Sequence, residues 1–402
     1  MGGSDDESIF RKVLKLREPW FVENVRLDEA EDIIRITVAT RPKVLVACPV
    51  CGRKCKVHDK IERTWRHTDV CESECYIIAK IPRCDCPECG VKQTDVPWAR
   101  ENVGFTERFE QKAMSLLRRM PISKVAEEMR TGPWVIEGII EDHVRKALER
   151  MDLSRVKNIM LDETSSKRGH RYITVIADAD TKKIIFMCDG RGSDSLSKFS
   201  AWLNERNGNA DNIRTVCCDF SKPFLSGLRT HFPNADIVYD RFHLVKMAND
   251  AMDKVRSKNQ INGQRDKKLR FALLRNSKNL NDADRERIFN IRTDNVIIGK
   301  AYEMKESLIQ LYDYPDADSA QEHITQWLNW VNEEGESPMR SLGKTVRKHL
   351  TKILNWFSDR RSNGFLEGLN GMIQTTKRIG RGYPNTSNFI SMIYFRHGRL
   401  GV

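Results

Sequence analysis

The hydrophobic pattern changes at residue 156, and this change constrains the fold more than any other feature of the chain. Upstream of it, apolar residues recur at helical spacing. Downstream, three segments rich in apolar and β-branched residues predict strands: 156–161, 171–177 and 183–188. Short links join them, which predicts an antiparallel meander. Helices and strands then alternate, which predicts parallel strands: helix 194–207, strand 213–218, helix 222–231 and strand 236–239.

This order of elements predicts an α/β fold of the ribonuclease-H-like type, with residues 153–256 as the first part of its core. From 241 to about 360 there is almost no strand signal, so we expect an all-helical insertion at 257–355. The strand-like segment 295–298 fits no element of that insertion. Residues 356–402 are predicted to supply a closing helix of the core and a basic C-terminal segment.

Three carboxylates stand where a two-metal site for phosphoryl transfer needs them. Asp162 follows the first predicted strand, Asp219 follows the fourth, and Glu367 lies on a predicted helix. Two Mg²⁺ (or Mn²⁺) ions activate an attacking oxygen and stabilise a leaving one, and Mg²⁺ prefers hard oxygen ligands. We expect Asp162 to bridge both ions, Asp219 to hold one and Glu367 to complete the other.

The residues around Glu367 predict an amphipathic helix. Its apolar face can pack on the sheet and consists of Phe365, Leu366, Leu369, Met372 and Ile373. Its polar face consists of Asn363, Glu367, Asn370 and Gln374. A lone carboxylate on a helix is usually a solvated surface residue, but the two asparagines on the same face favour a site.

Other acidic residues fit the site less well. Glu163 should point to the opposite face of its strand from Asp162. Asp178, Asp180 and Asp189 have turn-like neighbours, and we interpret them as turn formers.

Eight of the eleven cysteines fall between Cys48 and Cys89. Two Cys-x-x-Cys pairs, each followed by Gly, predict a zinc ribbon over 41–100, after an N-terminal segment 1–40. Its four ligands would be Cys48, Cys51, Cys86 and Cys89, which form a closed, structural site for one Zn²⁺. The alternative is a set of reduced core cysteines. The remaining candidates are interpreted as structural or exposed, with a second metal left open: Cys55, His58, His67, Cys71, Cys75 and Cys84.

Residues 101–152 predict a helix-turn-helix that binds DNA. A helix over 105–120 precedes a short one at 121–129, a turn with Gly132 and a third helix from about 134. Lys124 and Trp134 are the candidate DNA contacts. A plain helical linker is the alternative.

The charge of the chain indicates a polyanionic partner. The net charge is +12 and the isoelectric point is near 9.1. The segment 251–280 has nine Lys or Arg against two acids, and 371–402 has five and no acid. Lys377, Arg378 and Arg381 in the latter are candidate contacts to DNA phosphates. No apolar run is long enough to span a membrane and no signal peptide is recognisable, so we expect a cytoplasmic protein with no membrane partner.

Several motifs together carry a family resemblance: the Cys48–Cys89 ribbon, 161–163 with 167–172, 232–235, 240–246, 362–370, and 377–378 with 382–385. By these motifs the chain resembles bacterial insertion-sequence transposases of the ISL-three family over almost its whole length. The resemblance implies a DDE transposase with Asp162, Asp219 and Glu367 as its triad and an insertion domain between the last two. Asp240-Arg241-Phe242-His243 looks like the C/D-x-x-H signature of related recombinases, which implies that His243 lies near the active site. A strand-end cap at Asp240 and a buried structural histidine are the alternative.

The resemblance also implies the reaction. The enzyme would bind the terminal inverted repeats of double-stranded DNA, cleave there, and join the freed 3′-hydroxyl ends to target DNA. Because two ends are paired, we expect a homodimer or a higher oligomer, associated with the bacterial nucleoid. Cys217-Cys218 before Asp219 departs from the expected apolar pair, although a buried strand tolerates it. Two alternatives remain: a DNA-binding regulator with an inactive core, and a ribonuclease-H-like nuclease that cuts without joining.

Overall fold

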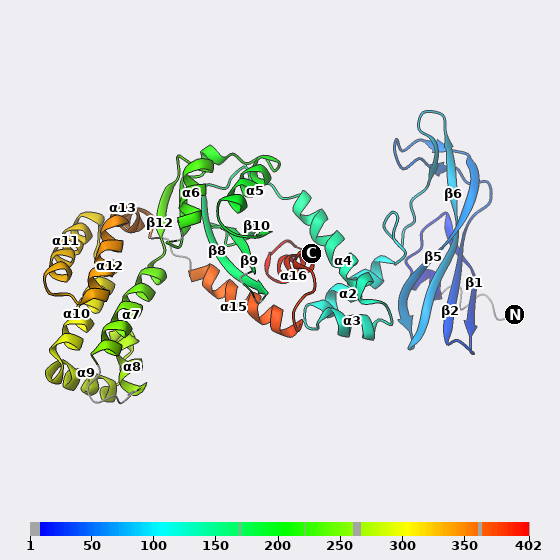
Figure 1. Ribbon diagram of the computed structural model, residues 1–402. Coiled ribbons are helices and arrows are strands. Elements are labelled where there is room, and N and C mark those ends of the chain that lie inside the picture. Colours follow the sequence, from blue (N-terminus) through cyan, green and yellow to red (C-terminus); the bar gives the residue numbers. More distant parts are fainter. Residues whose placement is uncertain are drawn as a thin grey trace. The chain divides into compact units, whose positions relative to one another are not determined.

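The computed structural model describes residues 9–167, 169, 171–220, 222–259, 267–360 and 364–401. It divides into two compact units, Met1–Asp142 and His143–Val402, which are described in turn (Figure 1). None of the described helices combines the length and the apolar character needed to cross a membrane.

The first unit is built on a mixed β-sheet in the order β1-β2-β6-β5, with β7 paired to β6. Only the β2–β6 pair in it is parallel. Its strands are β1 (Trp20–Asp28), β2 (Ile33–Thr40), β5 (Val57–Val70), β6 (Ser73–Cys86) and β7 (Gly90–Gln93). Three tryptophans meet edge to face in its core, with ring centroids 4.9 Å apart for Trp20–Trp98 and 5.4 Å for Trp65–Trp98. Strands β1 and β2, from the predicted N-terminal segment, therefore share a sheet with strands of the predicted ribbon region.

Two smaller parts complete this unit. A two-stranded sheet joins β3 (Val46–Ala47) to β4 (Lys54–Cys55). Three helices follow: α2 (Glu107–Leu117), α3 (Ile122–Glu128) and α4 (Pro133–Glu149), the last of which continues into the second unit. The Thr106 side chain caps α2 by accepting a hydrogen bond from the Phe109 backbone N–H. The three helices predicted between 105 and 151 are thus confirmed.

The second unit contains a five-stranded sheet in the order β10-β9-β8-β11-β12. The strands are β8 (Asn158–Lys167), β9 (Arg171–Asp178), β10 (Ile184–Asp189), β11 (Thr215–Cys218) and β12 (Asp236–Tyr239). The first three form the predicted antiparallel meander, and β11 runs parallel to both β8 and β12, as predicted.

One predicted boundary is wrong. The strand that was expected to end at Asp162 continues to Lys167, which pairs with Arg171. The apolar run stops at Leu161, but Thr164 and Ser166 are buried and keep the strand paired. Asp162 therefore lies within β8 and not after it.

Helices cover both faces of this sheet (Figure 1). On one face, Ser195 of α5 (Ser193–Asn204) and Thr174 of β9 share a hydrogen bond of 3.0 Å. α6 (Lys222–His231) packs beside α5, and the 3-10 helix η1 (Ala210–Asn212) precedes β11. On the other face lie α15 (Gly364–Ile379) and α16 (Thr386–His397), and Gln374 of α15 donates to Thr164 of β8 at 2.9 Å.

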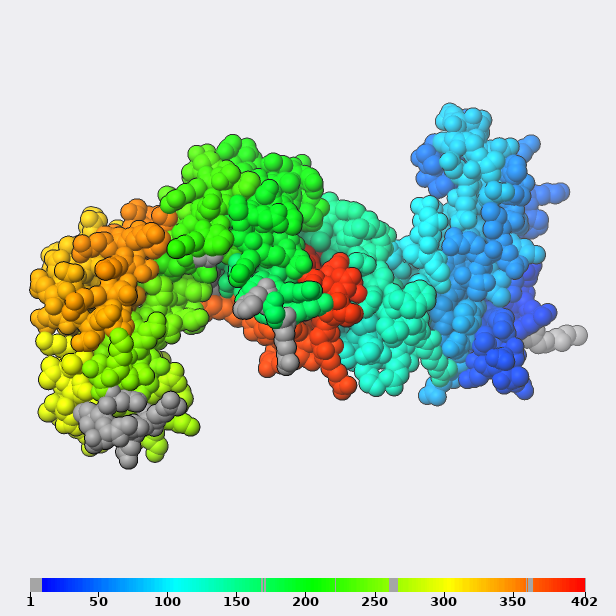
Figure 2. Space-filling model, viewed as in Figure 1, coloured from blue at the N-terminus to red at the C-terminus, as the bar shows by residue number. Residues whose placement is uncertain are grey.

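Every described element between β12 and α15 is helical, which confirms the predicted helical insertion for the described residues. The elements are α7 (Arg241–Lys258), α8 (Lys267–Leu274), η2 (Ser277–Asn279), α9 (Asp282–Asp294), α10 (Val296–Gln310), η3 (Leu311–Asp313), α11 (Ala317–Glu334), α12 (Ser337–Lys348), α13 (Leu350–Leu354) and α14 (Trp356–Asp359). Figure 2 shows their side chains packed together (lime to orange). Within the strand-like segment 295–298, residues 296–298 are helical, and the extended Asn295 caps α10 by accepting from the Ile298 N–H.

Candidate functional site

Three aspartates lie side by side across the middle of the second unit's sheet. β11 is in parallel register with β8 on one side and with β12 on the other. Continued by one residue past the end of β11, both registers place Asp219 level with Asp162 and with Asp240. Besides burial, the carboxylates of Asp219 and Asp240 both contribute to a raised pKa of Asp162, so the three side chains lie close enough to interact.

Helix α15 brings Glu367 to the same face. Asn370 Nδ2 donates to Asp162 Oδ2 at 2.8 Å, and Gln374 and Lys377 donate to the Ser165 carbonyl oxygen at 3.0 and 3.2 Å. These bonds lay α15 along β8, with Glu367 one turn before Asn370 (Figure 1). Burial raises the pKa of Glu367, and the neighbouring Asp240 carboxyl, to which it is hydrogen-bonded, raises it further. Glu367, Asp240 and Asp162 therefore meet on one face of the sheet.

His243 belongs to this group through Asp240. Asp240 is 1% exposed, and its Oδ2 accepts from His243 Nδ1 at 3.2 Å. That bond raises the pKa of His243, and the carboxylates of Asp240, Asp219 and Asp162 add to the rise. Asp240 precedes α7 but makes no side-chain capping bond to it. His243 itself is half-buried beside these carboxylates.

The crowding of carboxylates makes this face suited to a cation. Burial raises the pKa of Asp162; the Glu163 backbone N–H, 2.7 Å from Asp162 Oδ1, opposes that rise. Two further oxygens, Glu367 Oε1 and Asn370 Oδ1, are buried and have no hydrogen-bond partner among the described residues. Buried oxygens of this kind need a partner, and carboxylate and amide oxygens are the ligands that Mg²⁺ takes. The residues present therefore fit a divalent cation.

Glu163 lies on the other face of β8, as alternation along the strand predicts. Its cross-strand neighbour Thr174 bonds to Ser195 of α5, whereas Asp162 bonds to α15. Burial raises the pKa of Glu163 to about 7, and the Asp219 carboxylate contributes to that rise.

The four predicted zinc ligands come together in the first unit. The sulfur atoms of Cys48, Cys51, Cys86 and Cys89 all lie within 4.8 Å of one another. Among the described residues, no other group of three or more His, Cys, Asp or Glu side chains brings its ligand atoms this close together. The Cys51 backbone N–H lowers the pKa of the Cys48 thiol to about 6, whereas the Cys51 side chain raises the pKa of Cys89 to about 12. The site is therefore preorganised for one structural Zn²⁺.

The other cysteines and histidines of this region have different surroundings. Cys55 and Cys84 are buried beside the zinc ligands, and Cys75 lies in the tryptophan core. Cys71 is exposed. His67 is buried, and its Nδ1 lies 2.8 Å from Thr106 Oγ1.

The candidate DNA contacts lie mainly on the surface. Trp134, at the start of α4, is 74% exposed. Lys124 is exposed on α3 and pairs with Glu127 at 2.6 Å. Arg378 and Arg381 are exposed, while Lys377 is half-buried against β8. Asn363, predicted to share a face with Glu367, lies outside the described residues.

Comparison with known families decides the identity. Residues 159–393 match the ISL3 transposase family, and residues 94–144 match the helix-turn-helix domain of the same family. Residues 45–89 match the zinc finger of the transposases of IS204, IS1001, IS1096 and IS1165.

The chain belongs to the ISL3 family of transposases. Two relatives are similar over nearly its whole length. The transposase for insertion sequence element IS1001 of Bordetella parapertussis is 25% identical over 396 residues, which cover 95% of this chain and 97% of the relative. The transposase for insertion sequence element IS1557 of Mycobacterium tuberculosis (strain H37Rv) is 26% identical over 420 residues, covering 96% of this chain and 94% of the relative. The predicted order of zinc ribbon, helix-turn-helix and transposase domain is confirmed, and DNA binding follows from it.

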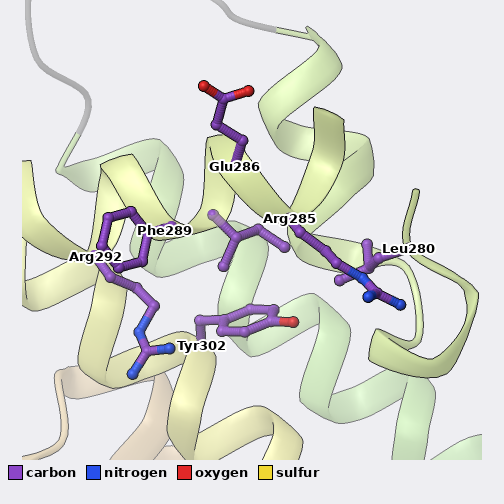
Figure 3. Close-up of a pocket in the computed structure, with 7 residues that line it drawn as sticks. Leu280, Arg285, Glu286, Phe289, Arg292 and Tyr302 are labelled. Atoms are coloured by element: carbon purple, nitrogen blue, oxygen red, sulfur yellow. The ribbon is translucent and has the colours of Figure 1, made fainter. Parts of the chain in front are cut away.

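The helical segment of this transposase also contains an open pocket of about 440 Å³ between α9 and α10 (Figure 3). Its lining is Leu280, Arg285, Glu286, Ile288, Phe289, Arg292 and Tyr302. Arg292 forms an ion pair with Glu303. None of the carboxylates described above lines the pocket, and we assign it no part in the reaction.

Sequence reasoning left two residues of this site without a firm role. Asp240 carried a signal in its spacing to His243, but an aspartate that only ends its strand fits the same spacing. Asn370 was expected on the face of Glu367, and only the structure brings its amide to Asp162.

Proposed function

We propose that this transposase cleaves the ends of its insertion sequence and joins the 3′-hydroxyl ends to target DNA by a two-metal DDE reaction. The observation that carries the proposal is the gathering of Asp162, Glu367 and Asp240, with Asp219 beside Asp162, next to buried oxygens that have no hydrogen-bond partner among the described residues. The strand order, a meander followed by parallel β11 and β12, supports a ribonuclease-H-like core.

Each residue would have its own part. Asp162, in the middle, would contact both Mg²⁺ (or Mn²⁺) ions; Asp219 would hold one and Glu367 the other. When bound, such ions activate the attacking oxygen and stabilise the leaving oxygen. His243, oriented by Asp240, would contact the DNA backbone next to the scissile phosphate.

The DNA itself would be held by other parts of the chain. The ribbon with its Zn²⁺ and the helix-turn-helix, including Lys124 and Trp134, would bind the terminal inverted repeats. Lys377, Arg378 and Arg381 would bind phosphates along the basic C-terminal segment. A homodimer or higher oligomer would pair two ends, acting on DNA in the bacterial cytoplasm. We propose the following domains: an N-terminal segment (1–40), the zinc ribbon (41–100), the helix-turn-helix (101–152), the first part of the core (153–256), the helical insertion (257–355), and the closing helix with the basic segment (356–402).

The test uses the zinc-loaded full chain, labelled DNA with the element's own ends, Mg²⁺ and a target plasmid. Wild type should give cleavage at the repeat tip and joined product on a denaturing gel. Glu367→Gln and Asp162→Asn should still bind the ends but lose both products by roughly a hundredfold or more. Glu163→Gln, on the other face of β8, is the matched control and should keep them.

Other outcomes would replace the proposal. Binding without cleavage by wild type, in either Mg²⁺ or Mn²⁺, would indicate a regulator with an inactive core. Cleavage without joined product would indicate a nuclease.

A further inference from the structure

Asn370 joins the two halves of the candidate site. It lies on α15, one turn after Glu367, and its Nδ2 donates to Asp162 Oδ2 at 2.8 Å. A carboxylate can only accept hydrogen bonds, so the amide must present its NH₂ group to Asp162. Its carbonyl oxygen is consequently turned away from Asp162.

That carbonyl oxygen is buried and has no hydrogen-bond partner among the described residues. Glu367 Oε1, one turn earlier on the same helix, is in the same condition. Two buried acceptors next to Asp162 have no donor to satisfy them, and a cation is the partner that satisfies several oxygens at once.

We propose that Asn370 is a further ligand and a positioning residue of the divalent-metal site. Its nitrogen fixes the orientation of Asp162, and its oxygen adds a neutral ligand beside Glu367. This inference rests on the proposed function, because it concerns the same cation site. An amide suits the position: a fourth carboxylate would add negative charge to Asp162, Asp219 and Glu367, and it could not donate to Asp162.

The competing explanation is that Asn370 only ties α15 to β8. Gln374 supplies a matched control, because it does the same one turn later. Its Nε2 donates to Thr164 Oγ1 at 2.9 Å and to the Ser165 carbonyl oxygen at 3.0 Å. Its own oxygen is not among the buried unpartnered atoms of the described residues.

The experiment measures Mn²⁺ binding to the zinc-loaded full chain by electron paramagnetic resonance and titration calorimetry, without DNA. Asn370→Ala should weaken Mn²⁺ binding about 10- to 100-fold, while Gln374→Ala should stay within about twofold of wild type. Asn370→Asp keeps an oxygen but cannot donate to Asp162, so it should weaken Mn²⁺ binding clearly less than Asn370→Ala does. Thermal melts of each variant check that it is folded.

The outcomes separate the inference from the proposed function. Asp162→Asn serves as the reference that removes the site. If it loses Mn²⁺ and Asn370→Ala does not, Asn370 is no ligand and the inference alone is wrong. If Asn370→Asp lowers the Mn²⁺ affinity as much as Asn370→Ala does, the hydrogen bond to Asp162 explains the whole effect. The ligand role of Asn370 is then overturned. If wild type binds Mn²⁺ no better than Asp162→Asn, the metal site fails, and the proposed function fails with it.

Discussion

Arg100 ties two helices of the first unit together, and its removal should cost that unit much of its stability. The guanidinium donates to Glu110 of α2 through Nε–Oε2 at 2.8 Å and Nη2–Oε1 at 2.6 Å, and it also pairs with Asp142 of α4. The Glu110 side chain is 3% exposed. Arg100→Ala therefore leaves a buried carboxylate without its bidentate partner, which costs about 3–5 kcal/mol. The total free energy of unfolding of a domain is only roughly 5–15 kcal/mol.

Hydrogen exchange measured by mass spectrometry on peptides from α2 and α4 gives the local free energy of opening. Arg100→Ala should lower it by about 3–5 kcal/mol and weaken binding to DNA ends, because α4 begins with the exposed Trp134. The double variant Arg100→Met with Glu110→Leu should recover most of the loss, since apolar residues of similar volume can replace a buried ion pair. A loss under about 1 kcal/mol, or a double variant no better than Arg100→Ala, would refute the reasoning.

Three further predictions concern zinc, pH and DNA. Cys48→Ser should release zinc and weaken end binding, whereas exposed Cys71→Ser should retain both; metal analysis and gel shifts check this, and full zinc content in Cys48→Ser would contradict it. Burial lowers the pKa of His67 to about 4 from 6.5, so the unfolded chain binds more protons between these values and stability falls as pH drops from about 6.5 to about 4. His67→Gln should flatten that fall in thermal melts, and an unchanged pH dependence would count against it. Lys377→Ala should weaken binding equally across DNA sequences and reduce the salt slope by about one; a sequence-selective loss would mean that it reads bases.

The order of strands could be predicted because each strand of the second unit is marked by an apolar run. The links indicate direction, since short links join antiparallel strands and helical links join parallel ones. The second half of β8 could not be predicted, because its polar sequence is typical of a loop. Its strand conformation depends on pairing with β9. Similarly, residues 295–298 have the β-branched composition of a strand. The cap at Asn295 and the packing of α10 override that local preference.

For the site, residue type and periodicity selected Asp162, Asp219 and Glu367 as candidates, although Asp162 lies within β8 and not at its end. The sequence left open whether Asp240 only ends its strand or takes part in the site, because that depends on where its side chain turns. The structure adds the hydrogen bond between His243 Nδ1 and Asp240 Oδ2. The quartet of zinc ligands was predictable because its spacing is a property of the chain alone.

The helical segment between β12 and α15 also delays the synthesis of Glu367 relative to that of Asp162 and Asp219. Asp162 and Asp219 leave the ribosome long before Glu367, which follows the whole of α7–α14. At about 5–20 residues per second, translation of the segment from Asp219 to Glu367 takes roughly 7–30 s. During that interval the nascent chain already contains the ribbon and helix-turn-helix sequences but lacks Glu367. If Glu367 holds a metal ion as proposed, a growing chain would be able to bind DNA near its own gene before it is able to cut it.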